Sequence, residues 1–239
     1  MRRALSFLTP LGGSTAPSPA ALAWFPVVGA ALGVVVGGLW WTASEIWPPA
    51  VAAALVVAAD LALTGMLHFD GLVDSADGLL PSLDRPRRLE VMADPRAGSF
   101  GVGAAVTVLL LRWSALSAMR PHALLLAGLW CASRTTMAVT ARSVPYARNG
   151  GLATAFLAAD GDGRRRVGIA AAGLAGSIVL AGAAGRGLGG LAAVVAAVAG
   201  ATGVVVLARR RLGGFTGDVL GAAGMVGETA GLLAAAVRW

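Results

Sequence analysis

Residues 22–42 read LAWFPVVGAALGVVVGGLWWT, an apolar stretch of 21 residues without a charged side chain. A helix needs about 20 such residues to cross the hydrocarbon core of a bilayer. Trp24, Trp40 and Trp41 lie near the ends of the stretch, where amphipathic aromatic rings favour the membrane interface. The stretch therefore predicts a transmembrane helix over Leu22–Trp41.

The rest of the chain is apolar enough to hold several more such helices. Hydrophobic residues make up 57% of its 239 residues and charged residues 13%, about half the charged fraction of a soluble domain. Six further apolar stretches predict spans at Ala50–Leu67, Ser99–Met119, His122–Ala141, Val167–Ala184, Leu188–Ala208 and Val219–Val237. We therefore expect an all-α, polytopic membrane bundle of about seven transmembrane helices that forms one domain over residues 1–239.

The basic residues are all arginines, 19 in number, and they give the chain a formal net charge of +7. With seven spans, 14 of the 19 fall on one side: Arg2, Arg3, Arg85, Arg87, Arg88, Arg96, Arg142, Arg148, Arg164, Arg165, Arg166, Arg209, Arg210 and Arg211. Only Arg120, Arg186 and Arg238 fall on the other side, and Arg112 and Arg134 lie inside spans. Arginine-rich loops face the cytoplasm, which predicts a cytoplasmic N-terminus in the cytoplasmic (inner) membrane. The basicity then reflects topology, and we expect a lipid bilayer and no nucleic acid as partner.

An acidic motif, His68-Phe-Asp-Gly-Leu-Val-Asp-Ser-Ala-Asp-Gly78, follows the second predicted span. The spacing of Asp70, Asp74 and Asp77 places the three carboxylates on one narrow stripe of a helix. Such close carboxylates repel one another unless a cation lies among them, and Mg²⁺ prefers carboxylate and phosphate oxygens. The motif therefore predicts Mg²⁺ ligands. The alternative interpretation is a solvated acidic turn or a set of helix caps.

Two further segments fall on the same predicted side. Asp94-Pro-Arg96-Ala-Gly98 combines an acid, an arginine and a glycine just before a predicted helix, a pattern suited to an anionic group or to a surface ion pair. Gly213-Gly214-Phe-Thr216-Gly-Asp218 offers close backbone approach, a hydroxyl and a carboxylate. Its alternative interpretation is a cap of the last span.

Polar residues inside spans are costly and often functional. Arg134 lies about two turns from the cytoplasmic end of its span, where it would reach a phosphate, and Arg112 lies deeper. Asp60 and Glu228 are natural partners for either arginine, and a buried structural ion pair is the alternative interpretation. His68, at a span end, is either structural or part of the substrate site.

Together these segments favour metal-assisted phosphoryl transfer at one membrane face. That chemistry depends on positioning and charge neutralisation and needs no lysine or thiol nucleophile. The chain contains no lysine, and its only cysteine, Cys131, lies within a predicted span.

The motifs resemble those of the cobalamin synthase family, whose members are adenosylcobinamide-GDP ribazoletransferases. The resemblance rests on Leu5–Thr9, the motif of residues 68–78, Asp94–Gly101, Arg134, Pro145–Arg148 with Gly150 and Gly151, Gly213–Ala222 and Glu228, in the family's order. Two positions depart from the family pattern. Phe69 stands where an acidic residue is usual, and Pro10 stands where an arginine is usual.

The resemblance implies that the 5′-hydroxyl of α-ribazole, or its 5′-phosphate, joins adenosylcobinamide-GDP and that GMP leaves, with Mg²⁺ as cofactor. Asp70, Asp74 and Asp77 would hold the metal, and Asp94 and Asp218 would complete its shell or accept the hydroxyl proton. The substrate-binding residues would be His68, Arg96, Arg134, Arg148, Gly214 and Thr216.

Three points stay open at this level. A CDP-alcohol phosphotransferase-like phospholipid synthase shares the acidic spacing, and a membrane transporter would use the charges inside the spans. A homo-oligomer is also compatible with the sequence.

Overall fold

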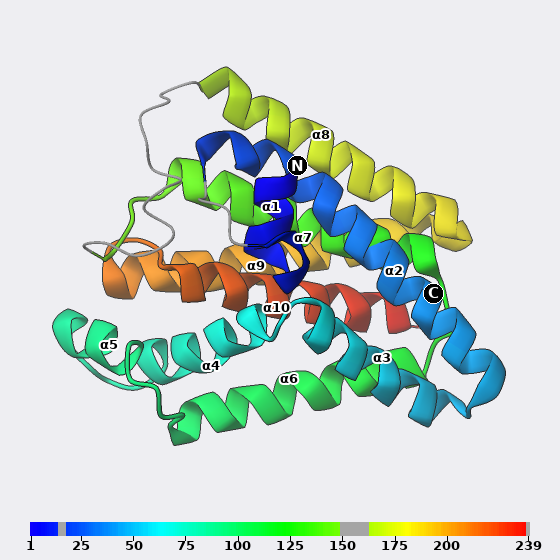
Figure 1. Cartoon of the computed structure of the whole chain (residues 1–239), viewed down its shortest axis with the longest axis horizontal. Helices are drawn as coiled ribbons and strands as arrows, with labels where there is room; N and C mark the ends of the chain where they lie inside the picture. Colours follow the sequence, from blue (N-terminus) through cyan, green and yellow to red (C-terminus); the bar gives the residue numbers. More distant parts are fainter. Residues whose placement is uncertain (14–17, 149–162, 238–239) are drawn as a thin grey trace.

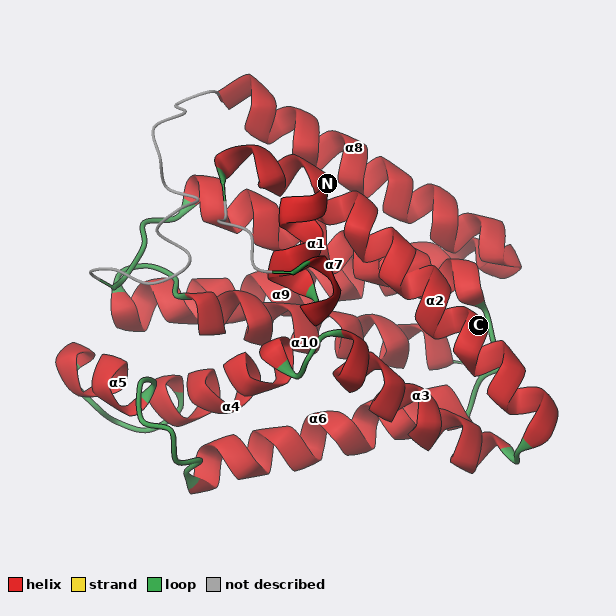
Figure 2. Ribbon diagram, in the orientation of Figure 1, coloured by secondary structure: helices red, strands yellow, loops and turns green. Residues whose placement is uncertain are grey.

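The computed structural model describes residues 1–13, 18–148 and 163–237, and these residues form helices and turns without a β-strand (Figure 2). Six segments are long and apolar enough to cross a membrane, and a bent pair of helices can count as the seventh of the seven predicted. Five of the six segments contain the helices α2 (Phe25–Ile46), α6 (Ser99–Ser117), α7 (Ala123–Ser143), α9 (Gly187–Leu212) and α10 (Gly217–Ala236). The sixth, Arg166–Ala184, overlaps α8 (Gly163–Ala181). The chain is therefore a multi-pass, all-helical membrane protein. Gly150, Gly151 and Arg238 lie outside the described residues.

The second predicted span is not one straight helix. The chain forms α3 (Pro49–Leu63) and α4 (Leu67–Leu79), which meet at 90°. The predicted span over Ala50–Leu67 is therefore wrong as one continuous helix but falls within this bent pair, and the acidic motif lies in the second helix of the pair instead of beyond a span. The bend has a local cause, because Gly65 and Met66 both have a φ of 58°, which an α-helix cannot accommodate. When the pair counts as one broken span, the total is seven.

The centre of the bundle is formed by α7 and α10, the most buried of the spans. Close packing of backbones explains why these helices are rich in glycine and alanine. A Cβ atom on Gly33 of α2 would lie 2.5 Å from the Ala127 backbone of α7. Small residues of this kind are what brings membrane helices together, because no hydrophobic effect drives helix association inside lipid.

The predicted site segments lie at one end of the bundle, on the left in Figure 1. This end carries the end of α4, the short helix α5 (Arg85–Val91), the start of α6, the end of α7 and the turn from α9 to α10. The opposite end carries the turns α2–α3, α6–α7 and α8–α9. The arginine-rich connections that follow α4, α7 and α9 therefore share an end with the acidic motif. Arg2 and Arg3 begin α1 (Arg2–Leu8), which runs across the long helices.

Candidate active site

The acidic stripe lies on α4, which holds Asp70, Asp74 and Asp77 within a single helix. Asp74 lies at the centre of a cluster of charged side chains. The negative charges of Asp70, Asp218 and Asp77 all act on its carboxylate, and the opposing positive charge comes from Arg148. The structure thus adds Asp218, from the start of α10, to the carboxylates that the motif supplies. This concentration of negative charge attracts a cation.

Asp77 has a second role that the stripe did not reveal. Its Oδ2 accepts a hydrogen bond from the backbone N–H of Gly98 at 2.7 Å, and its Oδ1 accepts one from Gly101 at 2.8 Å. A Cβ atom on Gly98 would come within 2.6 Å of the same carboxylate, so glycine is needed there. The start of α6 does bind an anion, as its sequence predicts, and that anion is a carboxylate of the chain itself.

The turn from α9 to α10 is held against the end of α7. Phe215 N–H donates to the carbonyl of Pro145 at 2.9 Å, and Ala147 N–H donates to the carbonyl of Phe215 at 2.8 Å. Gly214 permits this pairing, because a Cβ atom there would collide with the Pro145 carbonyl. Gly214 is therefore required for close backbone approach, which agrees with the sequence-based expectation for this turn.

Two polar side chains of this turn lie at the start of α10. Thr216 caps the helix by accepting from the N–H of Val219 at 3.3 Å, which confirms the cap interpretation, and its hydroxyl donates to Asp218 at 3.2 Å. A capped helix start fixes the position of the Asp218 carboxylate beside the acidic stripe.

Arg148 joins the predicted segments to one another. One of its nitrogens, Nη1, lies 3.1 Å from Asp218 Oδ2, and Nη2 donates to the carbonyl of Met92 at 3.1 Å. Gly71 of α4 completes the assembly, because a Cβ atom there would lie 2.6 Å from the carbonyl oxygen of Asp218. The structure therefore brings together α4, the connection before α6, the end of α7 and the start of α10.

Asp94 and Arg96 pair with each other. Arg96 donates from Nε and from Nη2 to the two carboxylate oxygens of Asp94, at 3.0 and 2.8 Å. These hydrogen bonds lower the pKa of Asp94 to about 2. The Arg96 side chain is 87% exposed, and the described residues show no hydrogen bond from this pair to the α4 stripe. The geometry is thus that of the surface ion pair that the sequence left open.

Arg134 lies deep in the bundle, among charges from four helices. It forms an ion pair with Glu228, which also pairs with Arg112 at 2.6 Å, and Arg112 reaches Asp60 at 3.2 Å. The sequence named Asp60 and Glu228 as partners, and these pairs are confirmed. Arg134 is only 1% exposed and makes no described hydrogen bond to the α4 stripe. An unpaired charge would be costly at this depth, so the two arginines lie with the two acids.

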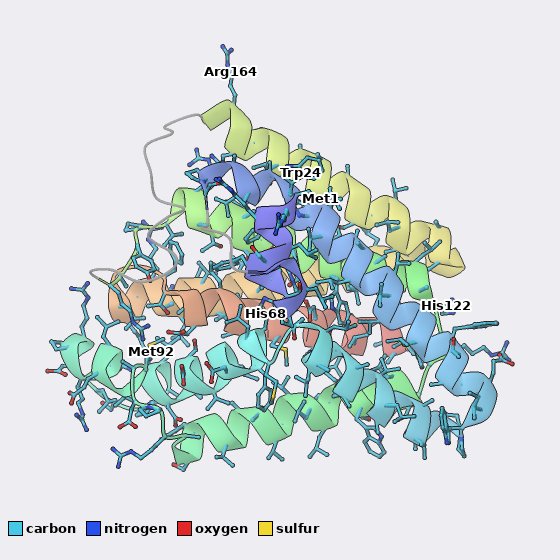
Figure 3. All side chains as sticks on the ribbon, in the orientation of Figure 1. Met1, Trp24, His68, Met92, His122 and Arg164 are labelled. Carbon is cyan, nitrogen blue, oxygen red and sulfur yellow. The ribbon has the colours of Figure 1, made fainter. Side chains whose placement is uncertain are left out.

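His68 also lies in the interior, near the middle of the bundle (Figure 3). The residue is 3% exposed, and neither ring nitrogen has a hydrogen-bond partner among the described residues. Among the described residues, His68 therefore makes no hydrogen bond to the carboxylates of the stripe. The charged side chains that influence the His68 ring electrostatically are Arg134 and Arg112.

Three arginines that the sequence assigned to membrane topology alone also shape the site. Arg88 donates to the carbonyls of Gly78 and Leu79, at 2.7 and 3.1 Å. Arg211 donates to three carbonyls just beyond, those of Leu79, Leu80 and Pro81, and Arg85 donates to the carbonyl of Leu212. They satisfy the free carbonyls at the ends of α4 and α9. For Arg88, a basic residue soon after the end of α4 was the signal for this role.

A metal site made by protein groups alone is absent from the described residues, because no three His, Cys, Asp or Glu side chains lie close enough to hold an ion. Mg²⁺ needs fewer than three protein ligands, because one or two carboxylates together with substrate phosphates and water complete its coordination shell. Asp70, Asp74 and Asp218 supply the hard oxygen donors and the excess negative charge. The donor set therefore fits Mg²⁺ that arrives with a phosphate-bearing substrate.

Fold and site together define a multi-pass helical membrane protein that gathers carboxylates and arginines at one end of its bundle. Comparison with known proteins identifies its family. A model of the cobalamin-5-phosphate synthase family matches residues 1–236, and the chain belongs to that family. The resemblance seen in the motifs is thereby confirmed. No solved structure matches the chain.

Several curated relatives carry the name adenosylcobinamide-GDP ribazoletransferase. The chain is 36% identical to the one from Chlorobium phaeovibrioides over 174 residues, which is 71% of this chain and 69% of the relative. It is 43% identical to the one from Pseudomonas paraeruginosa over 164 residues, which is 64% of this chain and 66% of the relative. A third relative, from Thermosynechococcus vestitus, is 50% identical over 103 residues, or 43% of this chain and 42% of the relative.

Proposed function

We propose that the protein is an adenosylcobinamide-GDP ribazoletransferase that forms adenosylcobalamin, or its 5′-phosphate, and releases GMP. The names of its relatives support the reaction. The observation that carries the proposal is the meeting of Asp74, Asp218 and Arg148 at the arginine-rich end of the bundle. A diphosphate needs both kinds of group, carboxylates for its counter-cation and arginine for its own oxygens.

In this reaction the 5′-hydroxyl of α-ribazole attacks the phosphate next to the cobinamide. A new phosphorus–oxygen bond forms, the bond to the GMP oxygen breaks, and the hydroxyl proton passes to a carboxylate of the chain. Asp218 is the proposed acceptor, and its contacts with the Thr216 hydroxyl and with Arg148 beside the acidic stripe support that role. Arg148 would turn from Asp218 toward the phosphate, where a guanidinium neutralises charge by paired hydrogen bonds.

Mg²⁺ is the proposed cofactor, with Asp70 and Asp74 as its main ligands. When bound, it would supply positive charge that stabilises the phosphate oxygens during the transfer. Asp77 keeps lone pairs for a metal even though each of its oxygens accepts one backbone hydrogen bond. Its first role in this chain is to hold the start of α6 beside the stripe.

The assay for this function is GMP release by purified protein from adenosylcobinamide-GDP and α-ribazole with Mg²⁺. We expect activity that a chelator removes and that Asp74→Asn lowers at least about a hundredfold, as is typical when a charge-stabilising group is lost. Glu90→Gln is the matched control, because Glu90 is an exposed acid at the same end that pairs with Arg87. Activity with a CDP-activated lipid in place of adenosylcobinamide-GDP would instead identify a phospholipid synthase.

We also propose that the acidic end faces the cytoplasm. The arginines of the connections that follow α4, α7 and α9 support this orientation through the positive-inside rule. Cysteine labelling tests it in a Cys131→Ser background. Ser82→Cys, at the acidic end, should react only with reagent that reaches the cytoplasm, and Arg120→Cys, at the other end, only with reagent outside. The reverse pattern would overturn the orientation.

A further inference from the structure

A cavity of about 510 Å³ lies beside α4, between α6, α9 and α10. It is separate from the acidic site. At 100° per residue, Leu72, which lines the cavity, lies 160° around α4 from both Asp70 and Asp74. The cavity therefore lies on the side of α4 opposite to Asp70 and Asp74.

The lining of the cavity is apolar, apart from the hydroxyls of Ser75, Ser99 and Thr107. It begins at the first residue of α6, Ser99, and continues to Val108, which is about 14 Å along the helix axis. Phe100 and Leu80, both 48% exposed, are among its lining residues. A hollow of this kind in the apolar layer has no water available to fill it and few groups for a polar ligand, so it suits a hydrocarbon chain.

The end of the cavity nearest the arginine-rich face lies beside a guanidinium. Arg211 follows the lining residue Leu207 by one turn of α9. Its Nη1 donates to the carbonyl of Leu80, which also lines the cavity. The described residues show no hydrogen bond from its Nε or Nη2. The Nε and Nη2 donors of this guanidinium match the oxygens of a phosphodiester.

We propose that this cavity binds an anionic phospholipid, with one acyl chain along α6 and the headgroup phosphate on Arg211. The two features argue for one ligand, because an acyl chain explains the apolar depth and a phosphate explains the arginine at its rim. A zwitterionic lipid carries a compensating positive charge that Arg211 would repel. The site thus selects lipids by net charge, through a contact that ties α9 to the end of α4.

Native mass spectrometry of the detergent-purified chain with phosphatidylglycerol or phosphatidylcholine tests the proposal. Wild-type protein should retain phosphatidylglycerol in preference to phosphatidylcholine. Gly103→Leu should abolish the retention, since a Cβ atom at Gly103 meets no atom within 4 Å and a leucine would fill the cavity. Gly38→Leu is the matched control, because Gly38 of α2 is equally open and lies outside the cavity. Equal retention by the two variants, at equal melting temperatures, would overturn the site.

The headgroup contact has its own pair of variants. Arg211→Gln should lower the preference for phosphatidylglycerol about tenfold, the size expected for one lost charge-assisted hydrogen bond. Arg210→Gln removes the same charge from the neighbouring position, which is exposed and makes no described hydrogen bond, and should leave the preference unchanged. An equal loss in both variants would mean that the lipid responds only to overall charge, and the site on Arg211 would be wrong.

Discussion

Arg112 of α6 and Glu228 of α10 form an ion pair inside the bundle, with 2.6 Å between Nη2 and Oε2. Glu228 also pairs with Arg134 of α7, and Arg112 with Asp60 of α3. Trp130 donates to the same Asp60 at 3.0 Å. Two positive and two negative charges from four helices thus cancel one another close to the bend between α3 and α4.

Glu228→Gln should therefore destabilise the protein strongly, because it leaves two buried arginines with a single carboxylate. Loss of one partner of a buried pair costs about 3–5 kcal/mol. Thermal unfolding in detergent measures the effect. Glu45→Gln, an exposed position on α2, serves as the control and should unfold at the wild-type temperature. Equal melting of both variants would show that the buried charges contribute no stability.

Comparison of Asp77→Asn with Asp74→Asn distinguishes an aspartate that positions a helix from one that acts in the reaction. An amide presents N–H donors to one of the two backbone N–H groups that Asp77 now satisfies, so the start of α6 loses a cap. We expect a loss of roughly 0.5–2 kcal/mol in stability without Mg²⁺, together with lower activity. Asp74→Asn should keep or raise stability without Mg²⁺, since it relieves repulsion, and should still lose activity. A stable Asp77→Asn protein would contradict the cap.

Asp94 should contribute little to proton transfer at neutral pH. The hydrogen bonds from Arg96 hold the pKa of Asp94 at about 2, below its ordinary value of 3.8, so the carboxylate is a weak base. Because the folded pKa is the lower one, the pair is fully formed above the ordinary value and is lost as the pH falls toward 2. Asp94→Asn should therefore leave the shape of the pH–rate profile unchanged between about pH 5 and 8. If the pH–rate profile of Asp94→Asn lost its fall in rate at acidic pH, Asp94 would be the general base and this prediction would be wrong.

The sequence predicts the helical membrane bundle and the meeting of its motif segments well, because uncharged length and arginine placement are strong signals. The partners of Arg112 and Arg134 follow from the cost of an unpaired charge in a membrane. The bend between α3 and α4 does not follow from hydropathy, since residues 50–67 are apolar apart from Asp60 and Thr64 and the left-handed φ of Met66 is unusual for its residue type.

The site was predicted in its composition more than in its contacts. The spacing of Asp70, Asp74 and Asp77 gives their helical face, but it cannot show that the backbone of α6 binds Asp77. Likewise, counting arginines by side gives topology, but it does not distinguish Arg211, which holds the end of α4, from the exposed Arg210 beside it. Such contacts depend on distances between helices that are far apart in sequence.

Gly71 sets the distance between the acidic stripe and Asp218, and Gly71→Ala tests whether that distance matters. Alanine favours a helix by up to about 1 kcal/mol over glycine, so α4 itself should not weaken. The new Cβ atom would lie 2.6 Å from the Asp218 carbonyl oxygen and 3.0 Å from its Cα, so α4 and α10 must move apart.

A displacement near 1 Å can cost about a hundredfold in rate, and we expect a loss of that order in GMP release. Gly38→Ala controls for the exchange itself, because no atom lies within 4 Å of its added methyl group, and it should keep full activity. If Gly71→Ala were as active as Gly38→Ala, the close contact between α4 and α10 would not be what places Asp218 for the reaction.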